Sequence, residues 1–92
     1  MIVSFKDKRT RKIWEGKPLR LDPAVLRKAQ LKLRYIQLAH EMADLYSPPG
    51  NRLEKLSGDR KGQYSIRVNQ QYRICFQWES DGAKEVEFVD YH

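Results

Sequence analysis

A run of alternating apolar and polar residues lies in the second half of this 92-residue chain. Residues 64–68 and 72–78 each place every second side chain on one apolar face, and polar residues 69–71 separate the two segments. This alternation predicts two antiparallel strands with one buried face, joined by a three-residue turn. Because a one-residue slip would turn apolar side chains outward, it also predicts the register. The predicted pairs are Val68 with Tyr72, Ile66 with Ile74, and Tyr64 with Phe76.

The predicted register sets Arg67 directly opposite Arg73 on the polar face. Like charges opposed on a sheet destabilise it by up to about 1 kcal/mol relative to a neutral pair. We therefore expect an anion beside them. It could be a local carboxylate, from Glu85 or Glu87 on the next strand, or a phosphate group, which arginine binds well. The hairpin alone leaves both alternatives open.

The rest of the chain predicts an α+β fold in one small domain, residues 1–92. Residues 2–5 form a short β-prone run, and residues 6–14 predict a short basic helix. Asp22 and Pro23 are a strong helix start, and apolar residues at helical spacing extend that helix to about Leu45. The expected order is strand, two helices and a three-stranded antiparallel meander, with the helices covering one face of the sheet.

The last predicted strand, residues 84–91, brings the end of the chain to the hairpin. Matching Phe88 with Phe76 puts Tyr91 opposite Arg73, whereas a shift of two residues puts Val89 there. Either register places Tyr91 on the face that holds both arginines. Asp90 points to the other face unless the strand end twists, and His92 follows as the last residue.

Composition narrows the class of protein. Eighteen Lys and Arg against twelve Asp and Glu give a net charge of +6, which favours a polyanionic partner such as nucleic acid. One cysteine excludes a disulfide framework, and the scattered His40, Cys75 and His92 show no metal-ligand spacing. From this spacing we expect neither a metal nor a small-molecule cofactor. Neither a signal peptide nor a membrane span is apparent, so we expect a cytoplasmic protein.

Arg67, Arg73, Tyr91 and His92 are therefore expected at one end of the sheet, beside a loop that carries Lys55 and further charged residues. Cleaving RNA without a metal requires a base for the 2′-OH, cations for the charge on the phosphate, and an acid for the leaving 5′ oxygen. Histidine suits the proton roles and arginine the electrostatic one. A terminal Tyr-His pair taken alone is more typical of a frayed chain end.

Two stretches resemble one known family: SPPGNRLEKLSGDRKGQYSIRVNQQYRICFQW and the ending VEFVDYH. Both are similar to the HigB toxins of bacterial toxin–antitoxin pairs, within the RelE/ParE superfamily, and the similarity extends over essentially the whole chain. It implies an endoribonuclease that cuts messenger RNA in the ribosomal decoding site without a metal. It also implies a helix-turn-helix antitoxin of the HigA type as the inhibitory partner.

By this resemblance, Arg73 matches the arginine that stabilises the phosphate, and Asp90, Tyr91 and His92 match the acidic-Tyr-His ending associated with activity. Candidate RNA and phosphate ligands around them are Arg67, Lys55, Arg60 and Lys61.

The loop before the hairpin departs from the family pattern. The best-described members have a histidine and a lysine where this chain has Glu54 and Ser57. Lys55 or Arg67 could replace the missing lysine. Because removing one such electrostatic interaction can cost roughly a hundredfold in rate, this departure predicts a slow enzyme.

Two other function classes compete with the nuclease. A toxin like those of the ParE branch would inhibit DNA gyrase without chemistry of its own, but it would have no need of a terminal proton-transfer residue. A binding-only nucleic-acid module would need exposed aromatic residues along a basic stripe. Here the aromatic residues mostly alternate onto the apolar face, where they are expected in the core.

Overall fold

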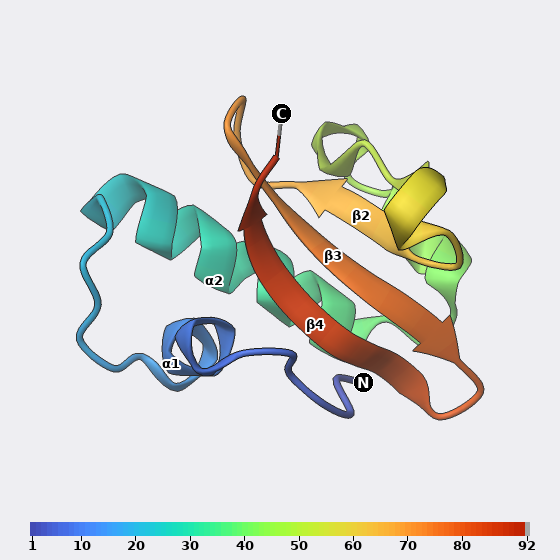
Figure 1. Cartoon of the computed structure of the whole chain (residues 1–92), viewed down its shortest axis with the longest axis horizontal. Coiled ribbons are helices and arrows are strands. Elements are labelled where there is room, and N and C mark those ends of the chain that lie inside the picture. The colour runs from blue at the N-terminus through green and yellow to red at the C-terminus, as the bar shows by residue number, and fades with distance from the viewer. Residues whose placement is uncertain (92) are drawn as a thin grey trace.

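The computed structural model describes residues 1–91 and shows an antiparallel sheet with two helices (Figure 1). The strands are paired in chain order: β1 (Glu54–Lys55), β2 (Tyr64–Arg67), β3 (Tyr72–Glu79) and β4 (Gly82–Asp90). The helices are α1 (Lys8–Glu15) and α2 (Pro23–Leu38), with the short 3-10 helices η1 (Met42–Tyr46), η2 (Pro49–Asn51) and η3 (Gly58–Arg60). The predicted α+β class is confirmed, and β1 adds a short strand within the stretch expected to be a loop.

The β2–β3 hairpin has the predicted register. Ile66 faces Ile74, Tyr64 faces Phe76, and Arg67 faces Arg73. Asn69 holds the turn, because its side-chain Oδ1 accepts hydrogen bonds from the backbone N–H groups of Gln71 at 2.9 Å and Tyr72 at 2.7 Å. The sequence pattern was therefore sufficient to align the two strands.

Of the two predicted registers, strand β4 adopts the one that is shifted by two residues. Val89 faces Arg73, and Phe88 faces Ile74 rather than Phe76. A register irregularity lies between Cys75 and Gln77 on β3. As predicted for either register, the ring of Tyr91 lies on the same face as Arg73, 5.7 Å from its guanidinium carbon.

Helix α2 begins where predicted and ends earlier. The Asp22 side chain accepts a 2.8 Å hydrogen bond from the Ala24 N–H. The helix ends at Leu38, because Ala39 is extended and the Asp44 carboxylate accepts the N–H groups of His40 and Glu41 to begin η1. The prediction that this helix continues to about Leu45 was therefore wrong.

The expected strand at residues 2–5 is present only as two parallel bridges, Ile2 with Ala83 and Phe5 with Val86. The N-terminal backbone lies so close to Gly82 that a side-chain carbon there would collide with the Met1 carbonyl oxygen. This contact, together with the φ of 130° at Gly82, requires glycine at the β3–β4 turn.

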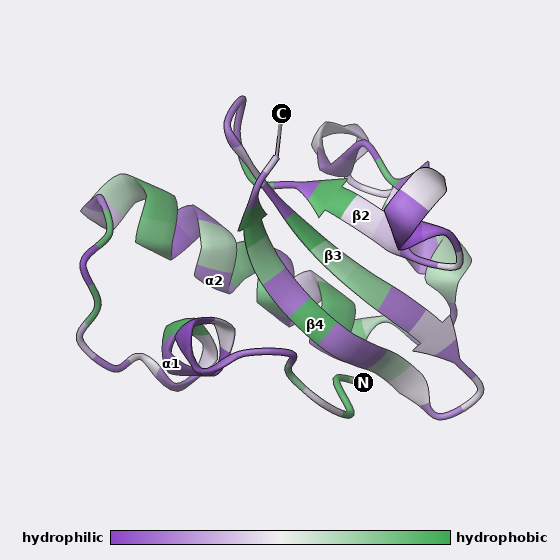
Figure 2. Cartoon of the chain, in the orientation of Figure 1, coloured by the Kyte–Doolittle hydropathy of each residue, from purple (hydrophilic) through white to green (hydrophobic). Residues whose placement is uncertain are grey.

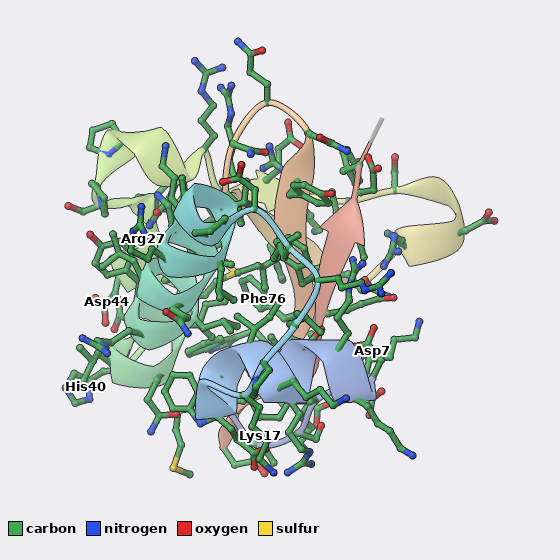
Figure 3. The ribbon with its side chains drawn as sticks, turned by 90° about the vertical axis from the view of Figure 1, so that its left-hand side faces the viewer. Asp7, Lys17, Arg27, His40, Asp44 and Phe76 are labelled. Atoms are coloured by element: carbon green, nitrogen blue, oxygen red, sulfur yellow. The ribbon has the colours of Figure 1, made fainter. Side chains whose placement is uncertain are left out.

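Both helices pack on the apolar face of the sheet. Figure 2 shows hydrophobic and hydrophilic residues alternating along β3 and β4. Phe76 is fully buried between α2 and the sheet (Figure 3), with Leu33 and Ile36 of α2 in the same core. Ile13 of α1 completes this layer. The opposite face, which carries the arginines, is therefore available for polar contacts.

No helix in residues 1–91 is both long and apolar enough to cross a membrane.

Candidate active site on the polar face of the sheet

Arg73 is the centre of the candidate site, and oxygen atoms fix its guanidinium. Its Nε donates to the hydroxyl of Ser65, which is fully buried, at 2.7 Å. Its NH2 group donates to the backbone carbonyl of Arg52 at 2.7 Å, and the Glu54 carboxylate lies 3.9 Å away. Arg52 has a positive φ of 45° at the end of η2, an uncommon conformation for a residue with a side chain. Arg73 is therefore held in one orientation mainly by neutral groups.

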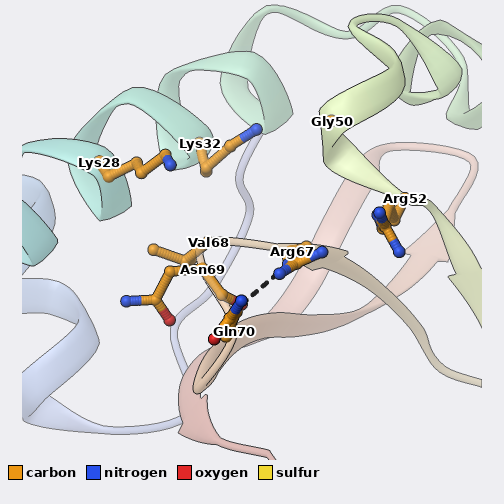
Figure 4. Close-up of a pocket in the computed structure, with 8 residues that line it drawn as sticks. All are labelled: Lys28, Lys32, Gly50, Arg52, Arg67, Val68, Asn69 and Gln70. Carbon is orange, nitrogen blue, oxygen red and sulfur yellow. Dashed lines mark hydrogen bonds between the residues drawn. The ribbon is translucent and has the colours of Figure 1, made fainter.

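Arg67 lies beside Arg73, and neutral oxygen fixes it too. Its Nε donates to the backbone carbonyl of Asn69 at 3.0 Å. Within residues 1–91, no ion pair of Arg67 is found within 4 Å. Its side chain borders a cavity of about 370 Å³ that also contacts Lys28, Lys32 and Arg52 (Figure 4). We call this cavity the basic pocket, defined by these four cations.

The end of β4 brings Tyr91 to this site. The Tyr91 backbone N–H donates to the Gln71 carbonyl at 2.8 Å, which fixes the chain beside the β2–β3 turn. The guanidinium carbon of Arg73 lies 5.7 Å from the centre of the half-buried Tyr91 ring, within the range of a cation–π contact. Asp90 is exposed at the strand end, and its carboxylate accepts a 3.0 Å hydrogen bond from the Gln71 side chain. His92, the predicted proton-transfer residue, lies outside the described residues.

The remaining predicted ligands differ in their surroundings. Lys55 on β1 and Lys61 after η3 are exposed. Arg60 has a carboxylate partner, because its NH1 group lies 3.1 Å from the Glu87 Oε1 atom. Burial lowers the pKa of Arg60, but the hydrogen bond to Glu87 and nearby negative groups outweigh it and raise that pKa overall. The structure thus places Arg60 in an ion pair with Glu87.

The Glu87 carboxylate pairs with cations other than the opposed arginines. It pairs with Arg60 and, at 3.8 Å, with Lys6. Glu85 is exposed with a φ of 53°, and its backbone N–H donates to the Ser4 hydroxyl. Among the described residues, neither glutamate forms an ion pair with Arg67 or Arg73. Of the two alternatives for the anion, the local carboxylates on β4 therefore do not neutralise the two arginines.

The contacts that four residues make in the site were not predicted from the sequence: Arg52, Ser65, Glu54 and Lys32. The alternation places Ser65 on the polar face, but nothing in it indicates the bond to Arg73. Glu54 was noted only as a departure from the family pattern, yet it is the described carboxylate closest to the Arg73 guanidinium. Lys32 belongs to a helix whose basic residues are typical of an exposed face, but it is buried.

Chemically, this end of the sheet is suited to a phosphate ester. An oriented arginine, a second arginine, an aromatic ring and nearby carboxylates are present together. Arginine binds phosphate oxygens with paired N–H groups, and an aromatic ring can stack on a nucleobase. Within residues 1–91, no three His, Cys, Asp or Glu side chains gather as metal ligands.

Comparison with solved structures defines the class of fold. Two structures of the YoeB–YefM toxin–antitoxin pair from Staphylococcus aureus contain similar chains. One matches with a TM-score of 0.63 and 17% identity, covering 100% of this chain and 98% of the other. The second, a heterotetrameric complex, matches with a TM-score of 0.64 and 19% identity, covering 100% and 95%. The fold is RelE-like.

Sequence comparison then gives the family. A model described as the RelE-like toxin of the type II toxin–antitoxin system HigB matches residues 3–92. Toxin HigB-1 of Vibrio cholerae serotype O1 is 44% identical over 94 residues, covering 100% of this chain and 98% of the relative. Endoribonuclease HigB of Proteus vulgaris is 33% identical over 93 residues, covering both chains completely. The chain belongs to the HigB-like toxin family.

Proposed function

We propose that this protein is a messenger RNA endoribonuclease that acts in the ribosomal A site without a metal and thereby arrests translation and growth. The observation that carries the proposal is the Arg73 guanidinium, held by Ser65 and Arg52 beside the Tyr91 ring. Family membership and the name of the Proteus vulgaris relative, an endoribonuclease, support the same activity.

Arg73 holds the scissile phosphate in this mechanism. The 2′-oxygen attacks phosphorus, the bond to the 5′ oxygen breaks, and negative charge grows on the non-bridging oxygens. A preorganised guanidinium stabilises that charge, and Arg67 or Lys55 assists it. Because neutral oxygens fix much of the Arg73 side chain, its charge remains available to the substrate.

Tyr91 stacks on or orients a base of the message, since a phenol with a reference pKa near 10 is a poor base unless shifted. His92 or Asp90 transfers a proton. Glu54 is an additional candidate for taking the 2′-OH proton, because its exposed carboxylate lies 3.9 Å from Arg73. Arg60 and Lys61 extend the cationic surface along the message, with Arg60 also fixed by Glu87.

The partners in this proposal are the messenger RNA, the ribosome and a helix-turn-helix antitoxin of the HigA type. The similar YoeB chains come from toxin–antitoxin complexes, which supports an antitoxin for this chain as well. We further propose that residues 1–92 form a single domain that acts in the cytoplasm. The apolar side of α2 is used by the core, so the antitoxin contacts another surface.

The test is message cleavage on translating ribosomes, with the wild type compared to Arg73→Ala and to a chain lacking His92. We expect the wild type to leave 2′,3′-cyclic phosphate ends and both variants to cut much less. A message with 2′-deoxyribose at the cleavage position is the matched substrate control, because it lacks the attacking group. Unchanged cleavage by both variants would contradict the assigned roles. Growth arrest with intact messages and a DNA-damage response would favour gyrase inhibition instead.

A further inference from the structure

The basic pocket collects positive charge from four separate positions in the fold. Lys28 and Lys32 project from successive turns of α2, Arg52 comes from the end of η2, and Arg67 from the end of β2 (Figure 4). Residues of the β2–β3 turn line the rest of the cavity, and none of the described lining residues is acidic. Four cations around one cavity repel each other unless an anion lies among them.

The burial and hydrogen bonding of Lys32 indicate that the fold itself organises the basic pocket. Its side chain is 6% exposed, and its Nζ donates to the Asn51 Oδ1 atom at 2.7 Å. Asn51 is itself fully buried, and its amide nitrogen donates to the carbonyls of Leu45 and Ser47 at 3.2 Å each. These bonds fix the oxygen of Asn51 toward the ammonium group. An ammonium has three N–H donors, and Asn51 accepts one of them.

The electrostatics of Lys32 are unfavourable without a ligand. Burial, and then repulsion by Lys28, lower the pKa of Lys32. A neutral amide oxygen offsets only part of the cost of burying a charge. Among the described residues, no carboxylate lies within 4 Å of Lys32. An anion entering the pocket would supply the missing opposite charge.

We propose that the basic pocket binds a second phosphate of the RNA backbone, separate from the scissile phosphate on Arg73. This inference rests on the proposed function and adds a binding subsite to it. Arg67 and Arg52 connect the two positions: Arg67 pairs with Arg73 across the hairpin, and Arg52 gives its carbonyl to Arg73 while its side chain lines the pocket. An RNA strand that runs along this end of the sheet would contact both the basic pocket and Arg73.

The test uses a single-stranded RNA oligonucleotide with 2′-O-methyl ribose throughout, which binds and cannot be cut. Its dissociation constant is measured by fluorescence anisotropy over a range of salt concentrations for Lys32→Met and Lys28→Gln. Lys12→Gln is the matched control, because it removes the same charge from an exposed position on α1, outside the pocket. The exposed Lys28 keeps the test informative even if Lys32→Met folds poorly.

We expect the dissociation constant to rise about tenfold for Lys32→Met, the effect expected for removing one hydrogen-bonded charge. A smaller rise is expected for Lys28→Gln. The slope of log affinity against log salt should become shallower by about 0.7 for each phosphate of a single strand that the variant no longer neutralises. Lys12→Gln should match the wild type in both measurements.

Equal affinities and slopes for the pocket variants and Lys12→Gln would overturn the proposal, as would a wild type that does not bind the oligonucleotide. A loss of antitoxin affinity with unchanged RNA binding would also overturn it, because the anion would then be an antitoxin carboxylate. Failure of the nuclease proposal looks different: the wild type would leave messages intact while pocket variants still weakened oligonucleotide binding. Intact cleavage with pocket variants equal to the control would reject the pocket alone.

Discussion

The polar face of the sheet has two halves that differ in the partners of their cations. In the paired half, Arg60 and Lys6 both contact the Glu87 carboxylate, at 3.1 and 3.8 Å. In the cationic half, hydroxyl and carbonyl oxygens hold Arg73 and Arg67, and the exposed Glu54 lies 3.9 Å from Arg73. The position of one glutamate therefore separates cations held by a carboxylate from arginines that are held mainly by neutral oxygens and keep their charge available to a substrate.

The largest effect is expected for Arg73→Gln. It removes the charge that faces the scissile phosphate, so cleavage on translating ribosomes should fall by about a hundredfold or more. Lys6→Gln is the control from the paired half, because Lys6 contacts Glu87 and has no assigned role toward RNA, and its cleavage rate should stay within a few-fold of the wild type. An equal reduction for both variants would mean that Glu87 does not separate the two halves.

A smaller reduction is expected when the support of Arg73 is removed. Ser65→Ala leaves the Nε of Arg73 without its 2.7 Å acceptor. We expect urea denaturation to show a decrease of about 1–2 kcal/mol in the free energy of unfolding, and cleavage to fall by about tenfold. The exposed Ser57→Ala should change neither. Lower stability with unchanged cleavage would show that Ser65 does not position the arginine.

Removing the carboxylate of the paired half should affect stability and leave cleavage unchanged. Glu87→Gln weakens the contacts with Arg60 and Lys6, and because the Glu87 side chain is only 18% exposed, we expect a decrease of about 1 kcal/mol in the free energy of unfolding in urea. Glu79→Gln, which breaks the more exposed pair with Lys84, should cost less. Reduced cleavage by Glu87→Gln would extend the active site into the paired half.

The smallest effect is a pH dependence from Cys75. Burial raises the pKa of its thiol above the reference value of 9.0, although the nearby Arg60 charge acts in the opposite direction. Above about pH 9 the unfolded chain loses this proton more readily than the folded one, so the free energy of unfolding should fall as pH rises. Cys75→Ala should remove this component in denaturation curves recorded on either side of pH 9. An identical slope in the variant would contradict the assignment.

Local pattern was enough to predict much of this fold. The register of β2 and β3 followed from alternation, and Asp22 with Pro23 marked the start of α2. The errors lie where the chain makes contacts beyond its own pattern. The end of α2 was predicted too late because the Asp44 carboxylate captures two backbone N–H groups and begins a new turn. Residues 2–5 form only bridges to β4.

The sequence by itself determined that Arg67 and Arg73 face each other and that Tyr91 joins them, because side chains alternate strictly along paired strands. The tertiary structure alone decided what surrounds those residues. Whether a cation meets Glu87, Ser65 or Asn51 depends on how its side chain is oriented and on which segments pack beside it, and no local periodicity records those distances. The opposed arginines were visible in the sequence, whereas the pairing of Glu87 with Arg60 and Lys6 instead of with them was not.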